Sequence, residues 1–251
     1  MRLEGKVALV TDIDSAGGAA IIRRFVKEGA RVAACPAGGG QPTGPASEAG
    51  AIPGDVLRLE GDVCVAADAE RIVNGVVERF GRLDVLVNHG AGGRIVGTIL
   101  DISREDFEQA VDGDVWTVIS LSRAAIPAMA KNGGGSILNI MSIGRVGLKD
   151  RPLRATDAGA LSTLTISMAL DHGVQGVRVN GLALGPTQTS LPEDPEELRA
   201  LLARFRGHAP LGTLHTADDV AAAALFLSSD EARAITGAVL PVDAGRSLPG
   251  F

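Results

Sequence analysis

The chain has 251 residues, enough to bury a sizeable core, and an α/β fold of this length commonly forms one domain. Its net charge of −6 argues against a general nucleic-acid binder, which would present a basic face. Its two cysteines, Cys35 and Cys64, lack the spacing of a metal site or a disulfide framework, so we expect no metal and a reducing compartment.

The beginning of the chain and its apolar segments indicate where the protein resides. Strand-like residues begin at Lys6, with no preceding apolar block of the kind that signal peptides carry. No apolar run approaches the roughly 20 residues that a membrane-spanning helix needs. We therefore expect a soluble, cytoplasmic protein with no membrane partner.

Short β-branched apolar runs alternate with longer amphipathic stretches, a pattern typical of a parallel sheet between layers of helices. Strands are predicted at residues 6–11, 31–34, 56–60, 84–88, 136–141, 177–183 and 239–242. Helices are predicted at residues 17–28, 67–80, 104–131, 155–174, 195–208 and 217–228. The pattern predicts an α/β fold.

One segment interrupts the alternation where a crossover helix would otherwise be expected. Residues 36–54 are rich in glycine and proline, which cannot sustain a regular helix. We expect a loop over 36–54 in place of that helix. No tandem repeat or second domain is apparent, so the expected organisation is a single domain over residues 1–251.

Five stretches of the chain carry a family resemblance through their order and spacing. They lie at residues 81–88, 135–140, 177–180, 210–212 and 242–245. They resemble the fourth, fifth and sixth strands and the C-terminal signature of the short-chain dehydrogenase/reductase superfamily. The resemblance covers nearly the whole chain. It implies a Rossmann-like, doubly wound sheet of about seven strands with helices on both faces, which binds NAD or NADP at the carboxyl ends of its strands.

The turn after the first strand departs from the glycine-rich pattern of the family. In relatives, bare backbone at this turn approaches the diphosphate of the cofactor at a helix N-terminus. Here the first two glycine positions hold Asp12 and Ala16, and Gly18 remains. Like charges about 4 Å apart repel by about 4 kcal/mol at an effective dielectric near 20, roughly a thousandfold in affinity. Asp12, helped by Asp14, is therefore expected to oppose a nucleotide, although either side chain can also cap the following helix.

Other positions of the implied nucleotide site give a mixed picture. Pro36 follows the second strand, where relatives place an acid for the ribose or a basic residue for an extra phosphate. Asp62, Asn88 and Thr189 match family positions that contact the nucleotide, although Asn88 fits a structural role at a strand end equally well. We therefore expect that no cofactor binds. If the chain is an active enzyme instead, the expected cofactor is NAD or NADP.

The resemblance also implies a catalytic serine, tyrosine, lysine and asparagine, and the chain keeps one of these four. Ser142 follows the fifth strand at the serine position. The tyrosine position falls on Arg154, the lysine position on Ala158 and the asparagine position on Asp114. The chain contains no tyrosine, so no shift of the alignment supplies a phenol. A guanidinium stays protonated at physiological pH, so Arg154 cannot exchange a proton as the phenol does.

The segment around Arg154 is basic within an acidic protein. The other charged residues of this segment are Arg145, Lys149, Asp150 and Arg151. Arg94, which follows the fourth strand, is expected to lie nearby. This cluster can attract an anionic small molecule such as a carboxylate or an acyl-CoA phosphate. Alternatively, Arg154 pairs with Asp114 or Asp157 and fills a disused cavity.

Two further side chains leave alternatives open. His89 is either a base in a non-redox reaction with Ser142 and Asp114 or a structural residue at a strand end. Trp116, the only tryptophan, is expected to anchor an interface or the core rather than to contact a substrate.

The chain keeps the family's structural motifs, but its catalytic and cofactor-binding positions are largely replaced. This contrast favours a catalytically inactive subunit. We expect it to form a homo- or hetero-oligomer, typically a tetramer, with an active paralogue that acts on a hydroxyacyl- or oxoacyl-CoA. The tail at residues 245–251 resembles the ending of heteromeric members, including the 2-[hydroxy(phenyl)methyl]succinyl-CoA dehydrogenase type. Two alternatives are an active oxidoreductase with an atypical mechanism and a non-redox enzyme or sensor of an anionic metabolite.

Overall fold

The structure is a computed structural model that describes residues 1–37, 51–90, 96–143, 150–185 and 209–248, with residues 194, 196, 199, 200, 202, 203 and 207 between the last two ranges. Several sequence-based expectations lie outside these residues. They concern most of the 36–54 loop and of the 195–208 helix, the end of the tail, and Arg94, Arg145, Lys149 and Thr189.

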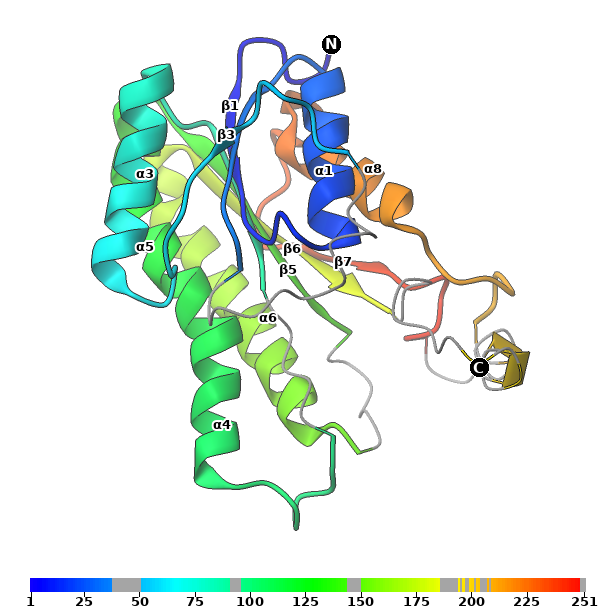
Figure 1. Ribbon diagram of the computed structural model, residues 1–251. Coiled ribbons are helices and arrows are strands. Elements are labelled where there is room, and N and C mark those ends of the chain that lie inside the picture. The colour runs from blue at the N-terminus through cyan, green and yellow to red at the C-terminus, as the bar shows by residue number, and fades with distance from the viewer. Residues whose placement is uncertain are drawn as a thin grey trace.

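Seven parallel strands form one sheet in the order β3-β2-β1-β4-β5-β6-β7 (Figure 1). The strands are β1 (Val7–Val10), β2 (Arg31–Ala34), β3 (Leu57–Arg58), β4 (Val85–His89), β5 (Gly135–Ser142), β6 (Val177–Leu184) and β7 (Val239–Val242). The strand order reverses between β1 and β4, which is the topological switch point of a doubly wound sheet. The predicted fold class is confirmed, with β3 shorter than the expected 56–60 strand.

Helices cover both faces of the sheet (Figure 1). The helices are α1 (Ala16–Lys27), α3 (Ala66–Phe80), α4 (Arg104–Val111), α5 (Thr117–Lys131), α6 (Pro152–His172) and α8 (Ala217–Ser228). Helices α1 and α8 pack on one face, and α3, α5 and α6 pack on the other. No helix among the described residues is long and apolar enough to cross a membrane.

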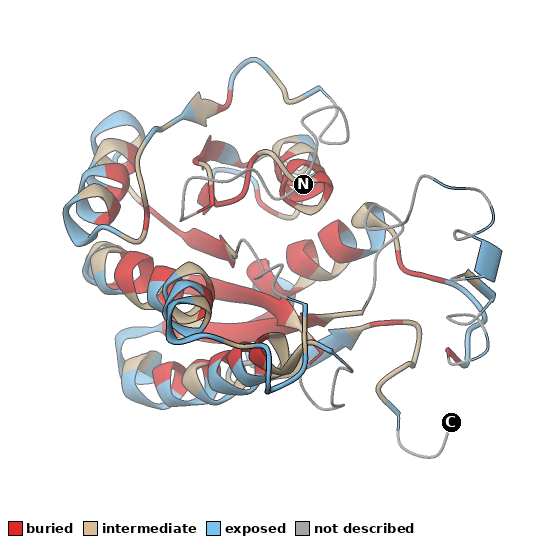
Figure 2. Ribbon diagram, turned by 60° about the horizontal axis from the view of Figure 1, so that its bottom comes forward, coloured by how far each residue is buried: buried red, intermediate tan, exposed pale blue. Residues whose placement is uncertain are grey.

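The alternation of side chains along the strands divides the core into two layers. In β1, Val7 and Leu9 join the cluster with α3, α5 and α6, whereas Ala8 and Val10 join the cluster with α1 and α8. All four side chains are fully buried, and the central strands are buried along most of their length (Figure 2). Burial on both faces explains why these strands are continuous apolar runs in the sequence.

The long helix expected at residues 104–131 is interrupted at its middle. Between α4 and α5, residues Asp112–Trp116 form a π-helical turn, a feature that often accompanies functional sites. Thr117 Oγ1 donates to the carbonyls of Asp112 and Gly113, at 3.2 and 3.0 Å. The indole N–H of Trp116 donates to Cys64 O at 2.8 Å, and the tryptophan side chain stays 38% exposed. Trp116 therefore ties this turn to the segment before α3 instead of filling the core.

Candidate active site

The position that the family gives to tyrosine is occupied by an arginine that reaches the retained serine. Ser142 ends β5, and Arg154 lies in the first turn of α6. Arg154 Nε donates a hydrogen bond to Ser142 Oγ. Burial lowers the pKa of the Arg154 guanidinium, and the negative charge of Asp114 opposes that shift. The guanidinium remains protonated, so a permanent cation engages the one retained catalytic hydroxyl.

Two buried carboxylates share this region with Arg154. Asp114 is 7% exposed and belongs to the π-helical turn, and Asp157 is 3% exposed and lies on α6. Burial and the charge of Asp114 raise the pKa of Asp157 to about 7. Among the described residues, Asp157 Oδ2 has no hydrogen-bond partner. Asp157 can therefore hold a proton near neutral pH, a property that the sequence did not reveal.

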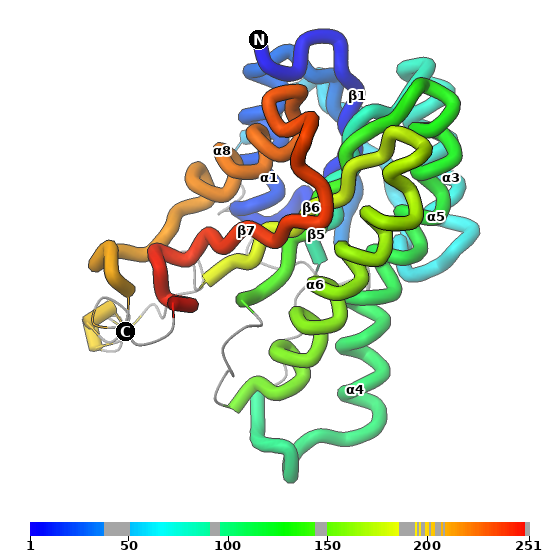
Figure 3. Tube along the Cα trace, turned by 180° about the vertical axis from the view of Figure 1, so that it is seen from behind, coloured from blue at the N-terminus to red at the C-terminus, as the bar shows by residue number. Residues whose placement is uncertain are grey.

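The family's four catalytic positions thus converge, but three of them carry other chemistry. Ala158, at the lysine position, is 2% exposed and follows Arg154 by one helical turn. A Cβ added to Gly90 would lie 2.8 Å from Asp114 Oδ1. The π-helical turn that carries Asp114 therefore packs closely against the end of β4. Helices α4 and α6 run side by side at this end of the molecule (Figure 3). Arg151 lies just before α6 and Asp150 is exposed, while the rest of the basic cluster lies outside the described residues.

At the turn after β1, the buried Asp12 pairs with the partly exposed His89 from the end of β4. Asp12 Oδ2 lies 2.6 Å from His89 Nδ1, and Asp12 is 1% exposed. We expected this carboxylate to face a diphosphate, and the structure instead directs it toward the imidazole. His89 shares a hydrogen bond with this carboxylate, so the simple repulsion estimate overstates the effect of Asp12. His89 also has the structural role at a strand end that was one of its two predicted roles.

The imidazole of His89 occupies space beside the first turn of α1. A Cβ on Gly17 would lie 3.1 Å from His89 Nε2. A Cβ on Gly18 would lie 2.0 Å from Asp12 O, so the retained glycine is required by the turn itself. Asp12 has φ 60°, in the left-handed region that aspartate tolerates better than most residues. The turn keeps a glycine-like backbone, yet side chains fill the place where relatives leave bare backbone, so it fits a diphosphate poorly.

Helix α1 is capped by Ser15, so the expectation that Asp12 or Asp14 caps it is wrong. Gly18 N donates to Ser15 Oγ at 2.9 Å, and Ser15 has the extended backbone of an N-cap residue. Ser15 is a neutral cap of the type that helices prefer. The carbonyl of Asp12 accepts from Ser15 N at 3.2 Å and from Ser15 Oγ at 3.1 Å.

Asn88 belongs to a buried chain of polar side chains and faces the interior. Asn88 Nδ2 donates to Asn139 Oδ1 at 2.9 Å and to Ser122 Oγ at 3.3 Å. Asn139 Nδ2 in turn donates to Thr165 Oγ1 at 3.0 Å. These bonds tie β4 to β5, α5 and α6. Of the two roles that the sequence left open for Asn88, the contacts favour the structural one.

Of the remaining positions of the implied nucleotide site, the structure describes Asp62, Pro36 and Ala16. Asp62 Oδ1 accepts from Cys64 N at 2.9 Å and closes the turn before α3. Pro36 is half-buried after β2 and carries no polar side chain, and Ala16 opens α1 with a methyl group. Within the described ranges, no group of three or more His, Cys, Asp or Glu side chains is placed to hold a metal.

Comparisons with known proteins agree with the fold and with the order of the motifs. Residues 14–247 match the family model described as enoyl-(acyl carrier protein) reductase. The chain is 35% identical over 253 residues to an uncharacterized oxidoreductase of Thermotoga maritima, with 98% of each chain covered.

Two solved structures are similar over nearly their whole length. A short-chain dehydrogenase/reductase variant of Serratia marcescens gives a TM-score of 0.85 at 30% identity, covering 99% of this chain and all of that one. A 7α-hydroxysteroid dehydrogenase in complex with NADH and 7-oxo glycochenodeoxycholic acid gives a TM-score of 0.84 at 29% identity, covering 97% and 95%. The protein therefore belongs to the enoyl-(acyl carrier protein) reductase family, within the short-chain dehydrogenase/reductase superfamily of NAD(P)-dependent oxidoreductases.

Proposed function

We propose that this protein is a catalytically inactive member of its family, which assembles with an active NAD(P)-dependent dehydrogenase or reductase subunit. The observation that carries this proposal is the hydrogen bond from Arg154 to Ser142. In the family resemblance, a tyrosine at position 154 exchanges the proton and a lysine at position 158 lowers its pKa. Arg154 cannot take up a proton, and the methyl group of Ala158 has no charge with which to tune one.

The missing proton exchange alone has a large expected cost. A positioned general acid or base contributes typically about 100- to 10,000-fold to a rate. The Asp12–His89 pair adds a second obstacle, because it fills the glycine turn where a diphosphate would lie. We propose that the isolated chain binds neither NAD nor NADP with useful affinity and transfers no hydride by the usual mechanism of the family.

An exposed apolar face supports the proposal of a partner subunit. Ile166, Leu170 and Val174 follow one another at intervals of four residues along α6 and the short helical turn after it. They are 47%, 77% and 92% exposed. Large apolar side chains clustered on one helix face mark interaction sites, and symmetric assembly buries such a face.

We propose as partner an active paralogue that acts on a hydroxyacyl- or oxoacyl-CoA, in a tetramer. The tail at residues 245–251, which resembles that of the heteromeric 2-[hydroxy(phenyl)methyl]succinyl-CoA dehydrogenase type, supports this choice of substrate class. Exposed Leu248 at the described end of the tail offers a second apolar contact.

Co-expression with a dehydrogenase of this family that is encoded beside it tests the proposal. We expect one complex in size-exclusion chromatography, in which the partner carries all hydride transfer. Leu170→Glu should dissociate the complex because it places a charge on the apolar face. Val65→Glu makes the same change on a half-exposed valine before α3 and should leave the complex intact. Two chains that elute separately, or turnover by this chain alone, would refute the proposal.

A second function is favoured by Asp157 specifically. A buried carboxyl with a pKa of about 7 is suited to acid–base chemistry at neutral pH. With Ser142 as a hydrogen-bonding group and Arg154 as an anion partner, the site would bind an anionic metabolite in a non-redox enzyme or sensor. A thermal-shift screen against acyl-CoA thioesters and dicarboxylates distinguishes the two functions, because a specific ligand raises the melting temperature. Loss of the shift in Arg154→Gln would assign the ligand to this site.

A further inference from the structure

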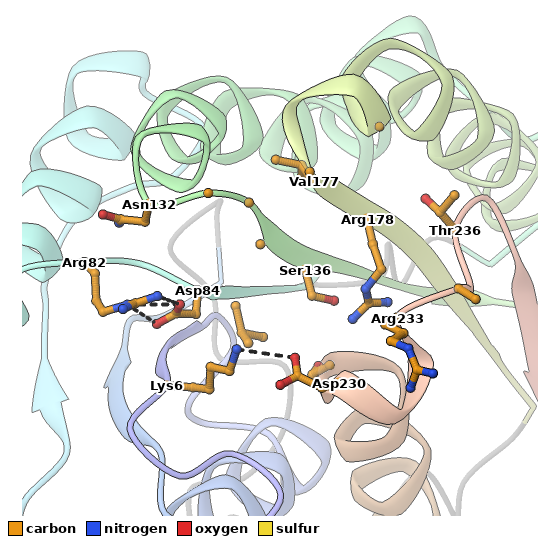
Figure 4. Close-up of a pocket in the computed structure, with 18 residues that line it drawn as sticks. Lys6, Arg82, Asp84, Asn132, Ser136, Val177, Arg178, Asp230, Arg233 and Thr236 are labelled. Atoms are coloured by element: carbon orange, nitrogen blue, oxygen red, sulfur yellow. Dashed lines mark hydrogen bonds and ion pairs between the residues drawn. The ribbon is translucent and has the colours of Figure 1, made fainter.

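A polar pocket lies where the central strands of the sheet begin (Figure 4), whereas Ser142 lies where β5 ends. It has a volume of about 510 Å³ and is formed where β1, β4, β5 and β6 begin. Its charged lining residues are Lys6, Arg82, Asp84, Arg178, Asp230 and Arg233. Ser136 at the start of β5 lines this pocket, and Ser142 ends the same strand, about 20 Å away at 3.3 Å per residue. The pocket is therefore separate from the candidate active site.

The pocket carries positive charge in an acidic protein. Its four cationic and two acidic side chains leave a net charge of +2, whereas the whole chain carries −6. A local charge of this sign in a concave site attracts small anions. A ligand can use only those cations that are not already engaged by structural contacts.

Two of the four cations are held by structural contacts within the protein. Arg82 binds both carboxylate oxygens of the buried Asp84, which also accepts from Val7 N at 2.8 Å. Arg178 Nη2 donates to Leu227 O at 2.8 Å, at the end of α8. These two arginines hold the fold together and supply a fixed positive background.

The other two cations remain available to a ligand. Lys6 Nζ lies 3.3 Å from Asp230 Oδ1, and Asp230 is 83% exposed, so this surface pair is weak and exchangeable. Arg233 is exposed, and its guanidinium has no hydrogen bond or ion pair to any residue that the structure describes. In the pocket, Arg233 and Arg178 lie next to one another on the side away from Arg82 (Figure 4).

A buried hydroxyl adds an unused donor to the same pocket. Ser228 lines it at the end of α8 and is 4% exposed. In the described parts of the chain, Ser228 Oγ has no hydrogen-bond partner. Buried hydroxyls are normally satisfied, by the protein or by something that it binds. An oxyanion between Arg233 and Ser228 would satisfy both groups.

The helix C-termini near the pocket disfavour an anionic ligand. Helices α5 and α8 end here, and the C-terminus of a helix repels anions. Several of the exposed carbonyls are already bonded, however: Arg178 covers Leu227 O, and Gly134 N donates to Met129 O at 3.0 Å. The donors of Arg233 and Ser228, unpaired among the described residues, therefore favour a ligand with a negative charge.

We propose that this pocket binds a small dianionic metabolite through its phosphate or carboxylate oxygens, with Arg233, Lys6 and Ser228 as the groups that contact it. The charge of the ligand follows from the net +2 of the lining residues. This site does not depend on the function proposed for Ser142 and Arg154.

Calorimetric titration of the full chain with phosphate, pyrophosphate and succinate tests this site. Sodium chloride keeps the ionic strength constant, so that general screening does not change between points. We expect saturable binding of at least one probe. Binding of phosphate or pyrophosphate alone identifies a phosphate-bearing ligand, and binding of succinate alone identifies a dicarboxylate.

Variants of two pocket residues assign the binding to this site. Arg233→Gln should weaken it about tenfold, the loss expected from one charge-assisted hydrogen bond. Ser228→Ala should weaken it severalfold without lowering the melting temperature of the free protein. Arg104→Gln removes the same charge from an exposed residue on α4, at the far end of the molecule, and should bind as the parent protein does. The proposal is overturned if no probe saturates, or if Arg233→Gln and Arg104→Gln weaken binding equally.

Discussion

Asp12 and His89 are 77 residues apart in the chain and form a part-buried contact of 2.6 Å between Oδ2 and Nδ1 across the switch point of the sheet. The pair joins the ends of β1 and β4, the neighbouring strands at which the strand order reverses. In the family's nucleotide-binding members, this is the place where bare backbone meets the diphosphate. Here a pair of side chains stabilises the same turn from within.

A change of either partner should therefore destabilise the fold. Asp12→Asn and His89→Ala should each lower the free energy of unfolding by about 1–3 kcal/mol, because each weakens or removes the hydrogen bond between the two side chains. The double variant should lose less than the sum of the two. Urea denaturation of the four proteins measures this coupling, and strictly additive losses would show that the contact contributes nothing.

Repair of the tyrosine and lysine positions alone should leave the protein inactive. Arg154→Tyr with Ala158→Lys restores the phenol and the ammonium group, but it leaves Asp12, Ala16 and His89 in the glycine turn. We expect no hydride transfer from NADH or NADPH until the turn is also restored by Asp12→Gly and Ala16→Gly, together with His89→Asn, which puts back the residue that the family resemblance gives for position 89. Activity in the two-site variant would show that the turn is not an obstacle.

The stability of the protein should depend on pH through Asp157. The folded protein holds this proton up to a pKa of about 7, compared with the ordinary 3.8 of the unfolded chain. The stabilising contribution is therefore fully present below about pH 4 and is lost as the pH rises toward 7. The asparagine of Asp157→Asn carries no charge at any of these pH values. The variant should therefore lack this pH-dependent decrease in the free energy of unfolding, which amounts to at most about 4 kcal/mol at neutral pH.

The matched control for this prediction is Asp171→Asn, which changes an exposed carboxylate on the same helix. Its unfolding free energy should follow the pH dependence of the parent protein. The prediction is tested by denaturation at about pH 5 and about pH 8. Parallel curves for Asp157→Asn and the parent would mean that the buried carboxyl does not carry the proton.

Much of the fold follows from local sequence patterns. The expected helix at 217–228 and the expected strand at 239–242 agree with α8 and β7 residue by residue, because capping residues and apolar runs mark their ends. Thr216 and Asp219 form a capping box at the start of α8. The interruption of the 104–131 helix had no comparable signal, since Gly113 alone costs a helix only about 1 kcal/mol.

The chemistry of the site was less accessible from sequence. The replaced positions Arg154, Ala158 and Asp114 were evident from the family resemblance, and the structure adds the bond from Arg154 to Ser142. The inward direction of Asp12 depends on His89, which only the tertiary fold brings close. The raised pKa of Asp157 likewise depends on burial beside Asp114, which no local pattern encodes.

Coenzyme binding tests most directly whether the turn after β1 has lost its affinity for a diphosphate. Purified protein should be titrated with NADH and with NADPH, and the fluorescence of the nicotinamide followed. We expect no saturation by either nucleotide, because the Asp12–His89 pair fills the turn and Pro36 offers the ribose no polar group. Saturable binding at micromolar concentrations would contradict it.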